Sequence, residues 1–325
     1  MDALSELLRA VKLSGAMFFN AEGSKPWCVE AVPSTTLGRY VASNATCVVE
    51  FHLVTQGTGY IRVGEETTPF SAGDLLMVPH GDPHVMGNGL GAPPESDSDD
   101  MAEVLSGGLK LLRFGGGGET TRFICGYFGC ERHADRLFLV GLPRMIKINL
   151  RGDPAGRWLE SSVCHLVSES ETGRPGQHIL LSKMAEALFI ESLRRYMAGL
   201  PPDEGGWLAG ARDPVVGAVL TAFHRKPEHH WTLDELAVEG AASRSVVAER
   251  FTRFIGEPPL TYLARWRLQL GARLLQATRR TVLDVAASVG YESEAAFNRA
   301  FKREFGVPPG QFRKTASGRA SPTRR

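Results

Sequence analysis

Short apolar runs separated by turn residues fill the first part of this chain, and apolar residues at helical spacing fill most of the rest. Between about residues 45 and 83 the apolar runs are only a few residues long, with glycine, proline and Thr-Glu clusters between them. Many short strands divided by turn residues are typical of an antiparallel sheet, sandwich or barrel. After residue 152 the apolar spacing becomes helical. The pattern therefore predicts a strand-rich region followed by helices.

The N-terminal segment predicts one amphipathic helix, and residues 178–199 predict a second, longer one. Leu4, Leu7 and Leu8 recur at helical spacing with charged residues between them, whereas a signal peptide would contain a continuous apolar run. The longer helix has an apolar stripe and stops before the linker "GLPPDEGG". Its stripe either packs on the sheet or forms the seam of a dimer, and both interpretations stay open.

Length and charge predict two domains, of which only the second meets a polyanion. A chain of 325 residues exceeds the usual size of one domain. Residues 212–325 carry 19 Lys and Arg against 11 Asp and Glu, whereas residues 1–211 carry 18 against 25. The C-terminal part is therefore basic and the N-terminal part acidic, which favours a nucleic-acid partner for the former.

Cysteine usage and hydropathy predict a cytoplasmic protein without a membrane segment. The five cysteines form an odd set in a chain without an export signal, so reduced thiols are expected. No apolar stretch approaches the roughly 18 uninterrupted residues of a membrane-spanning helix.

An internal repeat occupies the last third of the chain. Residues 232–259, "TLDELAVEGAASRSVVAERFTRFIGEPP", align with residues 281–309, "TVLDVAASVGYESEAAFNRAFKREFGVPP". The alignment pairs Gly240 with Gly290 as the sharp turn of each unit. It then needs one extra residue before Gly290 to bring the beginnings of the two units into register.

Each unit of the repeat predicts a helix, a tight turn and a second helix. Thr232 with Glu235, and Thr281 with Asp284, are candidate capping boxes at the start of each first helix. Ser243 and its equivalent in the second unit cap the next helix. The second helix of such a unit can lie in a DNA major groove. A connecting helix over residues 259–277 would hold two recognition helices about one DNA turn, roughly 34 Å, apart.

The repeat resembles the DNA-binding domain of the AraC/XylS family of transcription regulators over about residues 213–313. The motifs are the paired units, "RWRLQLGARLL" between them, and "VLDVAASVGYESEAAFNRAFKREFGVPPGQFR" at the end. The resemblance implies binding to promoter DNA, RNA polymerase as a partner, and activation rather than repression. It also implies base contacts, which would fall on Ser245, Ala248, Glu249, Glu294, Ala295, Asn298 and Arg299.

The recognition residues differ between the two units. Glu249 suits a cytosine amino group and Arg299 suits guanine, so the second unit is expected to carry more sequence information. The remaining charged residues are either phosphate contacts or solvated charges, and these are Arg244, Arg250, Arg253, Lys302 and Arg303.

The segment "GDLLMVPHGDPHVMGN" fits the second cupin motif at Gly73, Pro79, Gly81, His84 and Asn88. The N-terminal half therefore resembles the cupin sensor domains of many AraC-type regulators, and the resemblance implies that His84 points into the barrel, where catalytic cupins bind a metal. The first cupin motif is degraded, because only His52, with Gln56 nearby, stands where His-x-His and a downstream Glu are expected. A metal-dependent cupin enzyme with a DNA-binding appendage is the disfavoured alternative.

A replacement metal site could still be assembled from histidines and cysteines. Two imidazoles with one or two thiolates form a zinc-like ligand set, and the candidates are His80, His84, Cys28, Cys125 and Cys130. Cupin-containing AraC regulators that respond to oxidants carry similar residues. Cys125 and Cys130 are an odd number of residues apart, so in one extended strand they would face opposite sides.

Two interpretations without a metal also stay open. The histidines could instead satisfy hydrogen bonds in the loop, with the cysteines acting as small core residues. Alternatively, a small organic effector could bind in a pocket beside His52 and His84.

We therefore predict an α+β multidomain DNA-binding transcription regulator that is not an enzyme. Residues 1–150 form a cupin-like β-barrel sensor, residues 151–205 a helical connector, residues 206–315 an all-α twin helix-turn-helix domain, and residues 316–325 a disordered tail. The helix-turn-helix units span about residues 232–254 and 281–305. The expected partners are double-stranded promoter DNA, a small-molecule or oxidant effector and a second copy of the chain, with zinc as the candidate cofactor.

Overall fold

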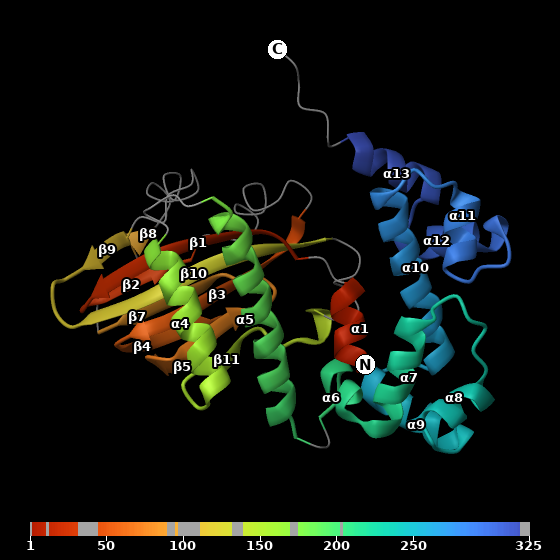
Figure 1. Cartoon of the computed structure of the whole chain (residues 1–325), viewed down its shortest axis with the longest axis horizontal. Coiled ribbons are helices and arrows are strands. Elements are labelled where there is room, and N and C mark those ends of the chain that lie inside the picture. The colour runs from red at the N-terminus through yellow and green to blue at the C-terminus, as the bar shows by residue number, and fades with distance from the viewer. Residues whose placement is uncertain are drawn as a thin grey trace, which may run out of the picture. The chain divides into compact units, whose positions relative to one another are not determined.

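The structure is a computed structural model, and it describes residues 2–10, 13–31, 45–89, 95–96, 111–131, 139–169, 175–201 and 204–318. The chain divides into two compact units (Figure 1). The sheet unit comprises Lys12–Asp135 and Leu142–Gly199, and the helical unit comprises Met1–Val11, Arg136–Gly141 and Leu200–Arg325. The helical unit therefore includes the beginning of the chain as well as its end.

Two sheets form the sheet unit. The larger sheet contains, in spatial order, β11 (Ile146–Asn149), β6 (Asp74–Val78), β3 (Ala45–Gln56), β10 (Thr120–Glu131), β1 (Leu13–Ser24) and β9 (Leu111–Gly115). The smaller contains β5 (Glu66–Ser71), β4 (Thr58–Val63), β7 (His84–Asn88), β2 (Trp27–Glu30) and β8 (Glu95–Ser96). Only the β1–β9 and β2–β8 pairs among these strands are parallel. The predicted strand-rich, cupin-like domain is confirmed, with two separate sheets in place of a closed barrel.

One apolar core joins the two sheets. Val48 and Val54 of β3 pack in it with Ile61 of β4 and Met86 of β7. Side chains of a strand alternate between its two faces, so the even-numbered residues of β3 face this core. Every residue of β3 from 48 to 54 is nevertheless buried, because helices cover the opposite face. The middle of β3 is therefore enclosed on both sides.

The helices α4 (Pro154–Glu169) and α5 (Gln177–Gly199) cover the larger sheet (Figure 1). Phe189 of α5 packs edge-on against Phe128 of β10, with ring centroids 5.2 Å apart. Leu181, Leu188 and Leu193 of α5 are buried, whereas Ile179 is 71% exposed. The structure thus supports the sheet-packing interpretation of this helix, and the dimer seam stays a prediction.

Helices make up most of the helical unit. They are α1 (Ala3–Ala10), α6 (Trp207–Arg212), α7 (Pro214–Arg225), α8 (Leu233–Glu239), α9 (Arg244–Ile255), α10 (Pro259–Ala277), α11 (Val282–Ser288), α12 (Glu294–Phe305) and α13 (Pro309–Gly318), with a short 3-10 helix at Leu139–Gly141. Because α13 extends to Gly318, the predicted tail falls mostly outside the described residues. None of the described helices is both long and apolar enough to span a membrane.

The repeat forms two helix-turn-helix units, α8–α9 and α11–α12. Both predicted capping boxes are present: Thr232 Oγ1 accepts from the Glu235 amide at 3.2 Å, and Thr281 Oγ1 accepts from the Asp284 amide at 3.1 Å. Ser243 and Ser293 cap α9 and α12 as predicted. Local sequence chemistry therefore fixes where each of these helices begins.

The turns of the two units align differently from the sequence-based alignment. Gly240 has a right-handed conformation, and the left-handed residue of the first unit is Ala241, with φ of 46°. In the second unit Gly290 is left-handed, with φ of 85°. The amide that follows each of these residues makes an equivalent hydrogen bond. The Ala242 amide donates to the Ala237 carbonyl oxygen, and the Tyr291 amide donates to the Ala286 carbonyl oxygen. Gly290 therefore corresponds to Ala241, and the extra residue follows Gly290 rather than preceding it.

Gly290 is expected to tolerate alanine less well than Gly306, the left-handed residue that ends α12. A Cβ at Gly290 would lie 2.7 Å from the Glu228 carbonyl oxygen, whereas a Cβ at Gly306 would meet nothing within 4 Å. Gly306→Ala should lower the unfolding free energy by about 1–2 kcal/mol because of its conformation alone. Gly290→Ala should cost about 1–3 kcal/mol more because of the steric overlap. Chemical denaturation followed by helical circular dichroism measures both, and equal losses would contradict the structure.

Candidate nucleic-acid interface and candidate metal centre

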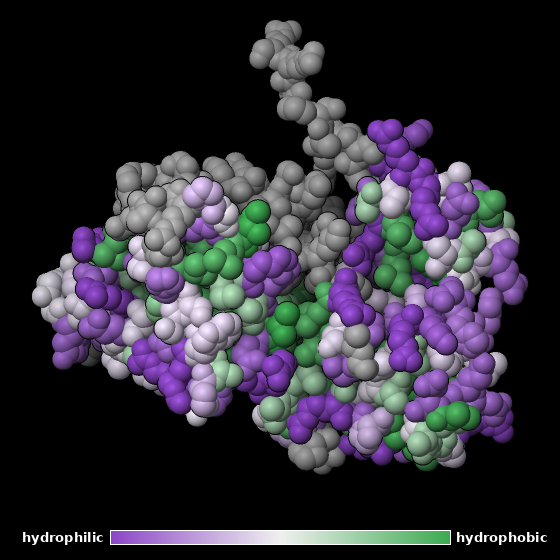
Figure 2. Space-filling view, in the orientation of Figure 1, coloured by the Kyte–Doolittle hydropathy of each residue, from purple (hydrophilic) through white to green (hydrophobic). Residues whose placement is uncertain are grey.

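The second helix of each unit has one buried face and one exposed face. Val247 and Phe251 of α9, and Phe297 and Phe301 of α12, are fully buried. Figure 2 shows hydrophilic residues over much of the visible face of the helical unit, with small hydrophobic spots between them. An amphipathic helix anchored in this way can present its outer face to a DNA groove.

The predicted DNA contacts lie mainly on these outer faces. The exposed residues are Arg244, Ser245, Glu249, Glu294, Ala295, Arg299, Lys302 and Arg303, and the half-buried ones are Ala248, Arg250 and Asn298. Arg244 pairs with Asp234 at 3.4 Å. Within the described part of the chain, neither Arg299 nor Lys302 forms an ion pair. Base contact and the spacing of the two helices stay predictions.

Arg250 has a partner inside the protein. Its guanidinium contacts the Asp213 carboxylate, whose side chain is 4% exposed. The other oxygen of Asp213 caps α7 by accepting from the Val215 and Val216 amides at 3.0 and 2.9 Å. Arg250 therefore fixes α9 to the N-terminus of α7, an interaction that the sequence did not indicate.

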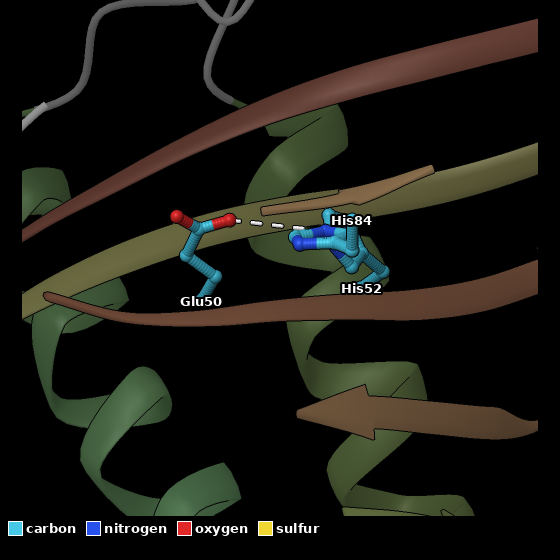
Figure 3. Close-up of side chains that lie close together, drawn as sticks. All are labelled: Glu50, His52 and His84. Atoms are coloured by element: carbon cyan, nitrogen blue, oxygen red, sulfur yellow. Dashed lines mark hydrogen bonds and ion pairs between the residues drawn. The ribbon is translucent and has the colours of Figure 1, made fainter. Parts of the chain in front are cut away.

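A group of three ionisable residues lies in the core between the sheets. Glu50 and His52 are two residues apart in β3, so both point toward the smaller sheet, and His84 begins β7 of that sheet. All three are at least 97% buried. One ligand atom from each lies within 4.8 Å of the others. Figure 3 shows the three side chains lying close together. Three donors in this arrangement could hold a metal ion.

The two imidazoles direct the same nitrogen into the group. His84 Nδ1 donates to the Asp82 carbonyl oxygen at 2.9 Å, which leaves Nε2 of the neutral ring as an acceptor. His52 Nδ1 lies 2.9 Å from Cys125 Sγ. The two Nε2 atoms are 2.8 Å apart, and His84 Nε2 is 3.8 Å from a Glu50 oxygen. Metal-binding histidines are commonly oriented by such hydrogen bonds to the opposite nitrogen.

Burial favours the uncharged form of all three groups. It raises the pKa of Glu50 well above its ordinary value, and the negative charge of Asp82 acts in the same direction. Burial lowers the pKa of His52 strongly, with a further contribution from His84, and it also lowers the pKa of His84. Neither carboxylate oxygen of Glu50 has a hydrogen-bond partner among the described residues. A divalent cation would supply the missing partner and favour the charged carboxylate.

The donor set fits a small divalent transition metal. Two imidazoles with one carboxylate occur in zinc sites and in iron(II) sites that keep positions open. Zinc binds nitrogen at about 2.0–2.1 Å, so two such ligands would lie roughly 3.4 Å apart in a tetrahedral site. The two rings would therefore need to separate by about half an ångström.

The other predicted ligands lie elsewhere. His80 Nε2 contacts the Leu142 carbonyl oxygen at 3.0 Å, and Cys28 is buried in β2; neither belongs to the group of three. Cys125 contacts His52 through the nitrogen that points away from the group, so it supports this ring rather than sharing the site. The side chain of Cys130 lies outside the described residues.

Glu50 is the residue that sequence reasoning missed. It precedes His52 by two residues, which is the spacing of the two histidines in the first cupin motif, and strand alternation was the signal that could have found it. A small cavity of about 30 Å³ lies beside the group, lined by His52, Cys125 and apolar side chains such as Phe19 and Met86. This volume is large enough to hold at least one water molecule. His52, but not His84, lines this cavity.

Comparison with known proteins agrees with this architecture. Residues 2–198 match a family model described as Cupin, and residues 236–315 match one described as a helix-turn-helix domain. A protein of Streptomyces lividans that is named as an AraC-like transcription regulator is 31% identical over 97% of this chain and 98% of its own. The HTH-type transcriptional regulator MtrA of Neisseria gonorrhoeae is also 31% identical, over 97% of this chain and 98% of its own.

A third relative is the RCS-specific HTH-type transcriptional activator RclR of Escherichia coli, which is 27% identical over 97% of this chain and 98% of its own. Two helix-turn-helix units beside a cupin domain define a DNA-binding transcription regulator, in agreement with the prediction that the chain is not an enzyme. The chain belongs to the AraC-like transcription regulators with an N-terminal cupin domain.

Proposed function

We propose that the buried group of Glu50, His52 and His84 is the signal input of this regulator and that it binds zinc. The observation that carries the proposal is the convergence of two Nε2 atoms on a buried carboxylate that has no hydrogen-bond partner among the described residues. Burying the Glu50 carboxyl without a hydrogen-bond partner is costly, which favours a bound cation beside it. Zinc binding would link residues of β3 and β7, and hence of both sheets.

The output of the regulator is the binding of promoter DNA by α9 and α12. The exposed cations on α12 and the basic composition of the C-terminal part support this role. We propose that the protein activates transcription together with RNA polymerase, because one full-length relative is named as an activator. The exposed apolar residues Ile179, Leu180 and Ile190 of α5 support a contact with a second copy.

Metal analysis tests the input. We expect the purified protein to carry about one zinc per chain after expression in zinc-replete medium. Glu50→Gln and His84→Ala should each lower the zinc content by about tenfold or more, because each removes a ligand that no other residue replaces. Loss of a residue that merely hydrogen-bonds to a metal ligand already lowers metal affinity by about 10–100-fold.

His80→Ala is the matched control because His80 contacts a carbonyl oxygen outside the group. It should retain its zinc. The proposal fails if the unmutated protein contains no metal, or if His80→Ala loses as much zinc as His84→Ala.

A specific contact favours an oxidant as a second input. Cys125 Sγ lies against His52 Nδ1 and lines the small cavity, and one relative is named RCS-specific. We propose that oxidation of the thiol to a sulfenic acid by a two-electron oxidant, such as hydrogen peroxide, disturbs the orientation of His52.

Cys125→Ser should abolish the change in DNA affinity that peroxide causes, while zinc content stays near that of the unmutated protein. Cys164→Ser is the control, because Cys164 is a more accessible thiol than Cys125 and lies in α4, outside the group of three. Fluorescence anisotropy with a labelled promoter fragment measures both. A peroxide response that survives in Cys125→Ser would exclude this thiol.

The DNA interface is tested at Arg299 and Lys302, which are three residues apart on α12. Arg299→Ala should cost about 1–3 kcal/mol and relax specificity at one base pair. Lys302→Ala should weaken binding to all sequences alike and lower the salt slope by about one. Binding titrations on cognate and scrambled DNA at several salt concentrations separate the two effects. Equal losses of Arg299→Ala on both DNAs would argue against base reading by that residue.

A further inference from the structure

The first helix of the chain is part of the helical unit, although in sequence it directly precedes the sheet unit. Helix α1 packs against α6 and α7. Ala3, Leu4 and Leu7 are buried, and Leu7 is completely inaccessible to solvent. Most of the apolar stripe of this amphipathic helix is therefore buried inside the unit that carries the recognition helices, and Leu8 is half-buried.

Local interactions favour the helical conformation of α1. The Ser5 amide donates to Asp2 Oδ1 at 2.9 Å, and this hydrogen bond lowers the pKa of the Asp2 carboxyl. Glu6 lies in the first turn and Arg9 in the last, which matches the helix dipole. The polar face that carries Arg9 points to solvent, with that side chain 65% exposed.

The surface that receives α1 belongs to the scaffold of the first helix-turn-helix unit. Helix α7 contacts α1, α6, α8 and α9. Its buried His224 stacks on Trp266 of α10, with ring centroids 4.3 Å apart, and lies 2.8 Å from the Tyr262 hydroxyl. The backbone of Ala3 lies beside the same imidazole, and burial lowers the pKa of His224 to about 3. The beginning of α1 therefore contacts the aromatic core of this unit.

Helix α1 is also bound covalently to the core strands of the sheet unit. Two residues separate its last residue, Ala10, from Leu13, the first residue of β1. Strand β1 pairs with β10, and Phe19 lies opposite Cys125, the thiol behind His52. Helix α7 is in turn fixed to α9 through Asp213 and Arg250. A continuous set of contacts thus runs from α1 to a recognition helix.

We infer that α1 is an intramolecular ligand of the DNA-binding unit, and that its docking surface on α6 and α7 is where the sensor acts on α9. The inference rests on the proposed function for the origin of the signal, because a signal from the buried group on β3 would pass through β10 to β1 before it reached α1. It does not require the two units to share any other contact. A change that strains β1 would alter how well α1 packs on α7.

Hydrogen exchange in the full chain tests the docking without any metal. Leu7→Asp should accelerate amide exchange in α7 and α9 by about tenfold or more, because a charge cannot be buried in this contact. Exchange in β3 and β10 should not change. Arg9→Ala is the matched control, two residues away on the exposed face, and should leave α7 unaffected. Unchanged exchange in α7 of Leu7→Asp would overturn the inference.

Cleavage of the connection tests the transmission of the signal. A protease recognition sequence inserted between Val11 and Lys12 allows the full chain to be compared before and after cleavage. The inserted but uncleaved protein is the control. Zinc alone is the probe, and the readout is the ratio of DNA affinities between the zinc-loaded and the chelator-treated protein.

We expect the released N-terminal peptide to stay bound and DNA binding to persist, whereas the zinc-dependent ratio falls to about one after cleavage, as for two uncoupled sites. A ratio that is the same before and after cleavage would overturn the inference. A ratio of one already in the uncleaved protein would count against the proposed function instead, and the exchange experiment then decides on the docking.

Discussion

Enclosure of β3 on both faces is the constraint on which the candidate metal site depends. One face of this strand packs against the helices that cover the larger sheet, so its alternate residues must point into the core between the sheets. Two of those positions hold Glu50 and His52 rather than apolar residues. A fold that needed only an apolar core would place valine or leucine there, as it does at Val48 and Val54. The retained polar residues cost stability, and this cost is the strongest sign that the core also serves a function.

The helical unit depends on a comparable constraint at the N-terminus of α7. Asp213 caps this helix with one carboxylate oxygen and contacts Arg250 of the first recognition helix with the other. On the second unit, Arg267 of α10 donates to the Pro227 and His229 carbonyl oxygens and lies beside the Gly290 turn. A single guanidinium thus connects the loop before α8 with the turn before α12. These polar contacts fix the helices where apolar packing alone would allow them to slide.

Sequence reasoning predicted the elements whose signals are local. The capping boxes at Thr232 and Thr281 and the serine caps of the recognition helices depend on neighbouring residues only, and all are present. The turn alignment was wrong because two glycines were matched by type, whereas the backbone places Ala241 in the conformation of Gly290.

The candidate metal site was only partly predictable, because its residues come together through sheet pairing. His84 could be placed in the core from the cupin motif, but Glu50 was overlooked since the expected residue type at that position was histidine. His80 and the cysteines were grouped by chemistry alone, and the direction of each side chain separates them from the group. The boundary predicted near residue 150 stays a prediction, and the contacts of α1 group this helix with the last third of the chain.

The position of α1 has a consequence for exchanging parts between regulators of this kind. A fusion made at the linker near residue 200 would give the DNA-binding helices a foreign sensor but leave the native first helix behind. The apolar surface of α6 and α7 would then be uncovered, or covered by a first helix with which it does not match. Functional chimeras should therefore take α1 and the C-terminal helices from one parent and the sheet unit between them from the other. The segment to exchange in this chain is its middle, inserted between the two ends, rather than everything before the linker.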